Sequence, residues 1–129
     1  MTPAEALAAR AHDDCIDVTT QGRVSGRPHT IEIWFGVIGD QLYLISGNGA
    51  GADWYRNLRA HPEASIRFAD GQVWSAGVRD VTDPEERRLV GDHMGAKYAY
   101  DGDPSIGLTR EAWCYDVPVL AFLLIERQS

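Results

Sequence analysis

The chain has 129 residues, enough for one hydrophobic core and too few for two of ordinary size, so we expect a single domain over residues 1–129. Apolar residues make up 44% of the chain and charged residues 24%, proportions typical of soluble globular proteins rather than of disordered or membrane proteins. The net charge of -7 argues against nucleic acid as a partner, because binding to a phosphate backbone needs clustered lysine and arginine.

Residues 1–14 are rich in alanine and acidic side chains and lack the basic start and apolar run of a signal peptide. The longest apolar run, residues 119–125, is far shorter than the roughly 20 residues that cross a bilayer. The sequence therefore predicts a cytoplasmic protein without a membrane span. Cys15 and Cys114 have no CxxC spacing and the four histidines are scattered, so we expect reduced thiols and no metal site.

The first half of the chain combines one helical pattern with several strand patterns. Apolar spacing predicts a helix over residues 3–12, and a strand follows over residues 15–20. The dipeptide Gly39-Asp40 separates two β-rich runs, residues 31–38 and 41–46, and predicts a hairpin with a type II′ turn. Side chains alternate along a strand, so the first run is expected to turn one face to the core. That face carries Ile31, Ile33, Phe35 and Val37.

The second half adds two helices and three strands. Apolar spacing predicts a helix over residues 52–61, ended by Pro62, and a second one that begins at Pro84 with Asp83 as its N-cap. The dipeptide Asp70-Gly71 predicts a type I′ hairpin between strands at residues 64–69 and 72–81. Residues 99–109 are predicted to form a loop and residues 117–127 a final strand. We therefore expect a mainly β (α+β) fold, a closed or half-closed sheet of about six antiparallel strands with about three helices.

Residues 46–54 run from a strand through a glycine-rich loop into a helix. Backbone N–H groups in such a loop can turn toward a phosphate, and the helix start favours a nearby negative charge. The loop matches neither the Walker A nor the GxGxxG pattern, and a plain connection with Asp53 capping the helix remains the alternative.

The turn at residues 19–29 places two arginines and a histidine in an otherwise acidic protein. It is either a solvated hairpin tip or a site that recognises the acidic tail of a cofactor, because arginine offers forked donors to phosphate and carboxylate. Most of the aromatic side chains are expected in the core. Tyr98 and Tyr100 follow the last helix, where a phenol could reach a substrate.

A family resemblance rests on three segments taken together, TTQGRVSGRPHTIEIWFG, LYLISGNG and ADWYRNLRAHPEASIRF. They resemble the deazaflavin-dependent nitroreductase family, a branch of the split-barrel group that includes pyridoxamine-phosphate oxidases. The resemblance covers residues 19–68 and implies a homodimer of split β-barrels. In such an enzyme, reduced coenzyme F-420 would deliver hydride to a small-molecule electron acceptor, a quinone, enone or nitro compound.

The resemblance also implies roles for individual residues. The strand at residues 29–34 would line the deazaflavin, the glycine loop would approach the phosphate, and the following helix would close the pocket. The implied cofactor residues are His29, Thr30, Ile31, Glu32, Ile33, Trp34, Ser46, Gly47, Asn48, Ala52, Asp53, Trp54 and Asn57. Tyr98, ahead of Tyr100 or water, would be the catalytic proton donor.

The chain departs from the family pattern at two positions. It has Asn48 where the family carries a lysine and Glu32 where the family carries a proline. Arg23, Arg27 and His29 are the residues that would compensate for the missing cation. FMN, with one phosphate and no polyglutamate tail, is therefore an alternative cofactor, and a carrier that binds a flavin-like ligand without turnover is a second alternative.

Overall fold

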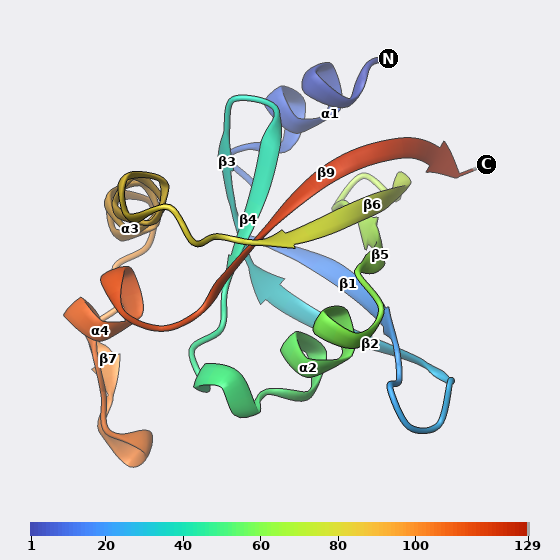
Figure 1. Ribbon diagram of the computed structural model, residues 1–129. Helices are drawn as coiled ribbons and strands as arrows, with labels where there is room; N and C mark the ends of the chain where they lie inside the picture. Colours follow the sequence, from blue (N-terminus) through green and yellow to red (C-terminus); the bar gives the residue numbers. More distant parts are fainter. Residues whose placement is uncertain (129) are drawn as a thin grey trace.

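The computed structural model describes residues 1–128, in which an antiparallel sheet of seven strands curls around a hydrophobic core (Figure 1). The strand order is β2-β1-β5-β6-β9-β4-β3. The strands are β1 (Cys15–Gln21), β2 (Pro28–Trp34), β3 (Gly36–Ile38), β4 (Gln41–Ile45), β5 (Glu63–Arg67), β6 (Val73–Asp80) and β9 (Val119–Gln128). The curled sheet and its covering helices confirm the expected mainly β split barrel.

The two edge strands of this sheet, β2 and β3, are consecutive in the sequence and are separated by Phe35 alone. Strand β2 pairs with β1, whereas β3 pairs with β4 at the opposite edge. The continuous strand predicted for residues 31–38 is therefore wrong. The chain bends at Phe35, whose side chain is fully buried, and the bend joins the two edges of the sheet.

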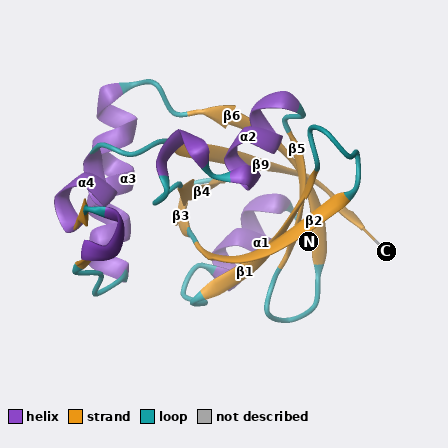
Figure 2. Ribbon diagram, turned by 90° about the horizontal axis from the view of Figure 1, so that it is seen from below, coloured by secondary structure: helices purple, strands orange, loops and turns teal. Residues whose placement is uncertain are grey.

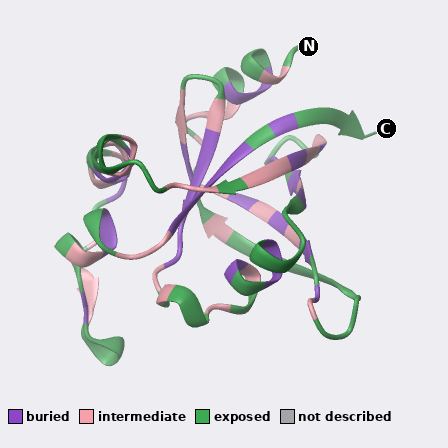
Figure 3. Ribbon diagram, viewed as in Figure 1, coloured by how far each residue is buried: buried purple, intermediate pink, exposed green. Residues whose placement is uncertain are grey.

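Two hydrophobic clusters lie on opposite faces of β4 and β9, because alternate side chains of a strand point to opposite faces. Leu44 and Phe122 belong to the cluster inside the barrel, as do the apolar side chains predicted for one face of residues 31–37. Tyr43 and Ala121 belong to the outer cluster. Strand β4 is buried along most of its length for this reason (Figure 3).

Helices cover both clusters. Helices α1 (Pro3–Arg10) and α2 (Asp53–Ala60) lie at opposite ends of the barrel and contribute side chains to the inner cluster (Figure 1). Helices α3 (Pro84–Lys97) and α4 (Arg110–Tyr115) lie together on one side and cover the outer cluster (Figure 2). Helix α3 begins as predicted, because the Asp83 side chain accepts a hydrogen bond from the Glu86 N–H.

The segment predicted as a loop, residues 99–109, contains short elements instead. They are β7 (Gly102–Asp103), the 3-10 turn η2 (Pro104–Ile106) and β8 (Leu108–Thr109). Helix α4 follows at once and was not predicted, because its six residues are too few to show helical periodicity. Residues 1–128 therefore form four α-helices rather than about three.

The two predicted hairpins differ in outcome. Residues 39–40 form a two-residue loop with Gly39 at positive φ, as expected. A type I′ turn needs positive φ at both central residues, but within residues 1–128 only glycines have positive φ, so Asp70 excludes it. Hydrogen bonds from the Phe68 N–H to the Gln72 carbonyl and from the Gly71 N–H to the Phe68 carbonyl close a three-residue loop instead.

None of the helices in residues 1–128 has the length and apolar character that a membrane-spanning segment needs. Cys15 is half-buried and Cys114 is buried, and both are free thiols. The hydrophobic run at residues 119–125 forms most of β9, in which Leu123 and Ile125 are exposed.

Candidate functional site

Two cavities of about 390 Å³ each lie on either side of Trp54, which lines both. The first, called the aromatic cavity here, lies between β2, the glycine loop and residues 94–113, and is lined by Trp34, Tyr100 and Trp113 among others. The second, called the hairpin cavity, lies between β2, the β1–β2 turn and α2, and is lined by Arg23 and His29 among others. Strand β2 therefore runs along both cavities.

Nearly all the predicted cofactor residues line one of these two cavities. Glu32, Ile33, Trp34, Gly47, Asn48 and Trp54 line the aromatic cavity. His29, Thr30, Ile31, Asp53, Trp54 and Asn57 line the hairpin cavity. Ser46 and Ala52 line neither. The Ser46 hydroxyl is buried and donates to the Gly49 carbonyl at 2.7 Å, and Ala52 precedes the first residue of α2.

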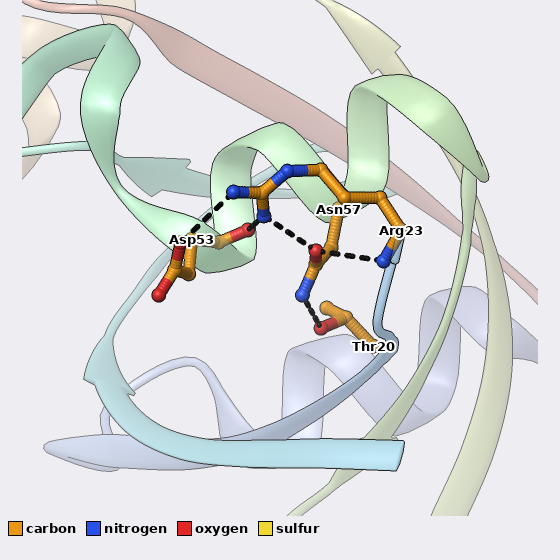
Figure 4. A network of polar contacts seen from close by, with 4 residues as sticks. All are labelled: Thr20, Arg23, Asp53 and Asn57. Carbon is orange, nitrogen blue, oxygen red and sulfur yellow. Dashed lines mark hydrogen bonds and ion pairs between the residues drawn. The ribbon is translucent and has the colours of Figure 1, made fainter. Parts of the chain in front are cut away.

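A polar network joins the β1–β2 turn to α2 (Figure 4). The Asn57 side-chain oxygen accepts hydrogen bonds from the backbone N–H of Arg23 at 3.1 Å and from its guanidinium at 2.8 Å. The Asn57 amide donates to the Thr20 hydroxyl at 3.2 Å, and the guanidinium also pairs with the Asp53 carboxylate at 3.1 Å. Asn57 is only 3% exposed, so this network fixes the position of the turn over the helix.

Ala52 occupies the N-cap position of α2, and no side chain caps the helix. Asp53 is therefore the first helical residue and not the cap. The backbone ladder of α2 begins with the bond from the Arg56 N–H to the Ala52 carbonyl, which leaves the three preceding N–H groups without an intrahelical acceptor. Such groups, together with the helix dipole, favour an anionic ligand.

Four aromatic rings meet at the end of β2. The rings of Trp34 and Tyr98 are stacked, with centroids 4.3 Å apart and an interplanar angle of 3°. Trp113 meets Trp34 edge-on at 6.0 Å and Tyr100 at 4.9 Å. Trp34 stacks on Tyr98, is 37% exposed and lines the aromatic cavity, so the exposed part of its ring is available to a ligand.

The Tyr98 hydroxyl is engaged by the backbone at the bend that closes the barrel. It accepts from the Phe35 N–H at 3.2 Å and donates to the Asp14 carbonyl at 2.6 Å. Lys97 donates to the Phe35 carbonyl at 2.9 Å. Tyr98 and Lys97 thus bind the backbone N–H and carbonyl of Phe35, which have no partner in a β-strand. Burial raises the pKa of Tyr98 to about 12. The catalytic role of Tyr98 stays a prediction.

Of the two phenols considered as proton donors, Tyr100 is the one that lines the aromatic cavity. Burial and then the charge of Asp103 raise the pKa of Tyr100, so its hydroxyl carries its proton at neutral pH. A protonated phenol at a cavity wall can donate a hydrogen bond or a proton to a bound oxygen atom.

Two arginines that no sequence pattern identified hold the wall of the aromatic cavity. Arg87 donates to the carbonyls of Trp113, Cys114 and Val117, at the end of α4. Arg110 donates to the carbonyls of Gly95 at 2.7 Å and Tyr100 at 2.9 Å. Gly91 gives a sequence signal for this wall, since a Cβ there would overlap the Cys114 carbonyl where α4 packs on α3.

The fold is shared with solved structures of different kinds. A conserved hypothetical protein from Mycobacterium tuberculosis matches with a TM-score of 0.72 and 22% identity, covering 98% of this chain and 82% of its own. A reductase dependent on reduced F-420 matches with a TM-score of 0.64 and 20% identity, covering 85% of this chain and 94% of its own. A heme storage protein from Vibrio cholerae matches with a TM-score of 0.67 and 17% identity, covering 100% of this chain and 93% of its own. These identities establish the fold alone.

No curated protein matches the chain. The family model described as F-420H(2)-dependent quinone reductase matches residues 7–106, which is most of the chain and includes every lining residue of both cavities except Leu108 and Trp113. This match confirms the expected oxidoreductase with coenzyme F-420 as its cofactor, and the chain belongs to the F-420H(2)-dependent quinone reductase family.

Proposed function

We propose that this protein uses reduced coenzyme F-420 to reduce a quinone, with enones and nitro compounds as further acceptors. The observation that carries the proposal is the course of β2 along two cavities that share Trp54 as a lining residue. Three residues of the strand line each cavity, and we infer that the two cavities together form one groove for an elongated cofactor and an acceptor beside it.

The residues of the groove fit a ligand with a flat ring system and an anionic tail. Arg23, His29 and the unbonded N–H groups at the start of α2 are the donors that would hold the anionic part. The Asp53 side chain is 85% exposed, so a phosphate can replace it as the partner of Arg23 at little cost. Trp34, Trp54 and the glycine loop would hold the ring.

When bound, reduced F-420 supplies the hydride for the reduction of the acceptor. The protein's part is to hold donor and acceptor in contact and to exclude water, which aromatic walls on both sides of the cavity favour. Tyr100 supplies a proton to an oxygen atom of the reduced acceptor. Tyr98 and Lys97 keep the bend at Phe35 in place and thereby keep Trp34 at the cavity wall.

A titration of the purified protein with F-420 and with FMN tests the cofactor. We expect F-420 to bind and the bound, reduced cofactor to be oxidised when menadione is added. FMN binding without F-420 binding would contradict the proposal, and it would favour a flavin reductase or oxidase on the same fold. If F-420 binds but no quinone, enone or nitro compound oxidises the bound, reduced cofactor, the result would favour a carrier that binds the cofactor without turnover.

We also propose that the protein is a homodimer, as the resemblance implies. A third cavity, of about 760 Å³, lies over β1, β5 and β6 and reaches Ile125 of β9. Leu123 and Ile125 are 51% and 61% exposed on that strand, so the sheet presents apolar side chains beside a hollow. Light scattering should give a dimer mass for the wild type and a monomer mass for Ile125→Glu. A wild-type monomer would contradict the proposal.

A cytoplasmic location is the last part of the proposal. Its support is the pair of free thiols, Cys15 and Cys114, because reducing compartments keep cysteines in this state. Fractionation of the host cell should recover the protein with cytoplasmic markers, and recovery outside the cytoplasm would contradict it.

A further inference from the structure

Charge is divided unequally between the two cavities. The hairpin cavity is lined by Arg23 and His29 as well as by Asp53. The aromatic cavity is lined by two carboxylates, Glu32 and Asp103, and none of its described lining residues is a lysine, an arginine or a histidine. Cationic donors are therefore present at one end of the groove, whereas the charged side chains that line the other end are both carboxylates.

Two cations that contact residues beside the aromatic cavity, Lys97 and Arg110, do not line it. Lys97 donates to the Phe35 carbonyl at 2.9 Å and also lies over the Phe35 ring, 3.9 Å from its centroid. Arg110 donates to three carbonyls of residues 95–100. Both side chains are held on the backbone behind the wall, so an anionic group that enters the cavity finds no cation to pair with.

The charges of the two carboxylates reach groups that line the cavity. Burial and then the charge of Glu32 raise the pKa of the Cys15 thiol, and the charge of Lys97 opposes this rise only in part. Burial and then the charge of Asp103 raise the pKa of Tyr100. An anion bound in this cavity would be repelled by the two carboxylates and would also lose its hydration.

We propose that Glu32 and Asp103 make this cavity select uncharged electron acceptors and reject anionic ones of the same shape. The inference rests on the proposed function for the identity of the acceptor, but the charge selection itself is a property of the cavity. Neutral quinones lose little on leaving water and pack against Trp34, Tyr100 and Trp113, whereas a sulfonated quinone would lose hydration and be repelled.

The test compares menadione with the anionic 1,4-naphthoquinone-2-sulfonate. Tryptophan fluorescence quenching measures their binding to the protein alone, and turnover at saturating reduced F-420 measures their kcat/KM. The variant is Asp103→Asn, since asparagine can still accept the two hydrogen bonds that Ser105 donates to Asp103. The matched control is Asp101→Asn, which removes the same charge from an exposed residue that does not line the cavity.

The ratio of sulfonate to menadione, in binding and in kcat/KM, should rise about three- to tenfold in Asp103→Asn and stay unchanged in Asp101→Asn. For the wild type the ratio should also rise between about 0.05 M and about 0.5 M salt, because salt screens the repulsion. A ratio insensitive both to Asp103→Asn and to salt overturns the inference. If neither quinone is reduced, the proposed function fails, and the binding ratio still decides the charge selection.

Discussion

The hairpin cavity and the aromatic cavity share β2 and Trp54, yet they are held together differently. The hairpin cavity is built by residues 22–57 and fixed by side chains, through the Arg23 and Asn57 network. The aromatic cavity joins residues as distant as Cys15 and Trp113, and arginines bound to backbone carbonyls fix its outer wall. The cofactor end of the groove is therefore locally determined, whereas the acceptor end depends on the packing of α3 and α4.

The largest effect is expected for Arg87→Ala, which removes a support of the aromatic cavity. Three carbonyls at the end of α4 would lose a charged donor, and we expect the free energy of unfolding to fall by about 2–3 kcal/mol. Urea unfolding measures the change. Arg88→Ala is the control, because Arg88 is exposed and pairs only with Glu85 and Asp92, and its loss should stay within about 0.5 kcal/mol.

A difference between the two cavities should also appear in function. If the variant Arg87→Ala still binds F-420 with wild-type affinity while its KM for menadione rises, the two ends of the groove are separable. An equal loss at both ends would show that α4 supports the whole groove.

The pair Tyr98→Phe and Tyr100→Phe separates support from proton transfer. Without the Tyr98 hydroxyl, the Phe35 N–H and the Asp14 carbonyl each lose a hydrogen-bond partner. The free energy of unfolding should therefore fall by about 1–2 kcal/mol. Tyr100→Phe should leave stability unchanged and lower kcat by about tenfold, because water replaces a positioned acid poorly. A loss of turnover in Tyr98→Phe without any loss of stability would instead support Tyr98 as the catalytic residue.

Arg23→Gln tests the hairpin cavity alone. The change removes the ion pair with Asp53 and the charge available to an anionic tail, so the Kd for F-420 should rise about fivefold. The kcat at saturating cofactor should not change. Arg27→Gln is the matched control, since Arg27 lies in the same turn, is exposed and lines neither cavity. Equal effects of the two variants would mean that only the overall charge of the turn matters.

The smallest effect is expected at the ion pair that anchors α3 to the sheet. Hydrogen bonds from Arg79, at 2.6 and 2.9 Å, lower the pKa of Glu86, and Tyr43 donates to the same carboxylate at 2.7 Å. A carboxylate with a lowered pKa stabilises the protein above its ordinary pKa, about 4.3, and this stabilisation is lost as the pH falls through the folded-state pKa.

Because Arg79 is 47% exposed, the contribution should stay below about 1 kcal/mol. Urea unfolding between about pH 3 and pH 6 should show a flatter acid limb for Glu86→Gln than for the wild type. Glu63→Gln, at an exposed position on β5, should leave the wild-type profile unchanged. Identical profiles for all three proteins would show that Glu86 does not contribute to the pH dependence of stability.

The sequence predicted the hairpin end of the groove well, since its signals are local. Glycines, strand alternation and apolar spacing predicted the turn, β2 and α2, whereas the cofactor residues came from the family resemblance, and nearly all of them line one of the two cavities. The outer wall of the aromatic cavity was missed because α4 is too short for a periodic pattern and Arg87 resembles any arginine on a helix surface. The bend at Phe35 was also missed, because a buried phenylalanine inside an apolar run continues the pattern of a strand.

A crystal structure of the protein with oxidised F-420 would show whether the two cavities form one cofactor groove along β2. We expect the ring system beside Trp34 and Trp54 and the anionic tail at Arg23 and the start of α2. A cofactor bound elsewhere, for instance in the cavity over β1, β5 and β6, would contradict the account.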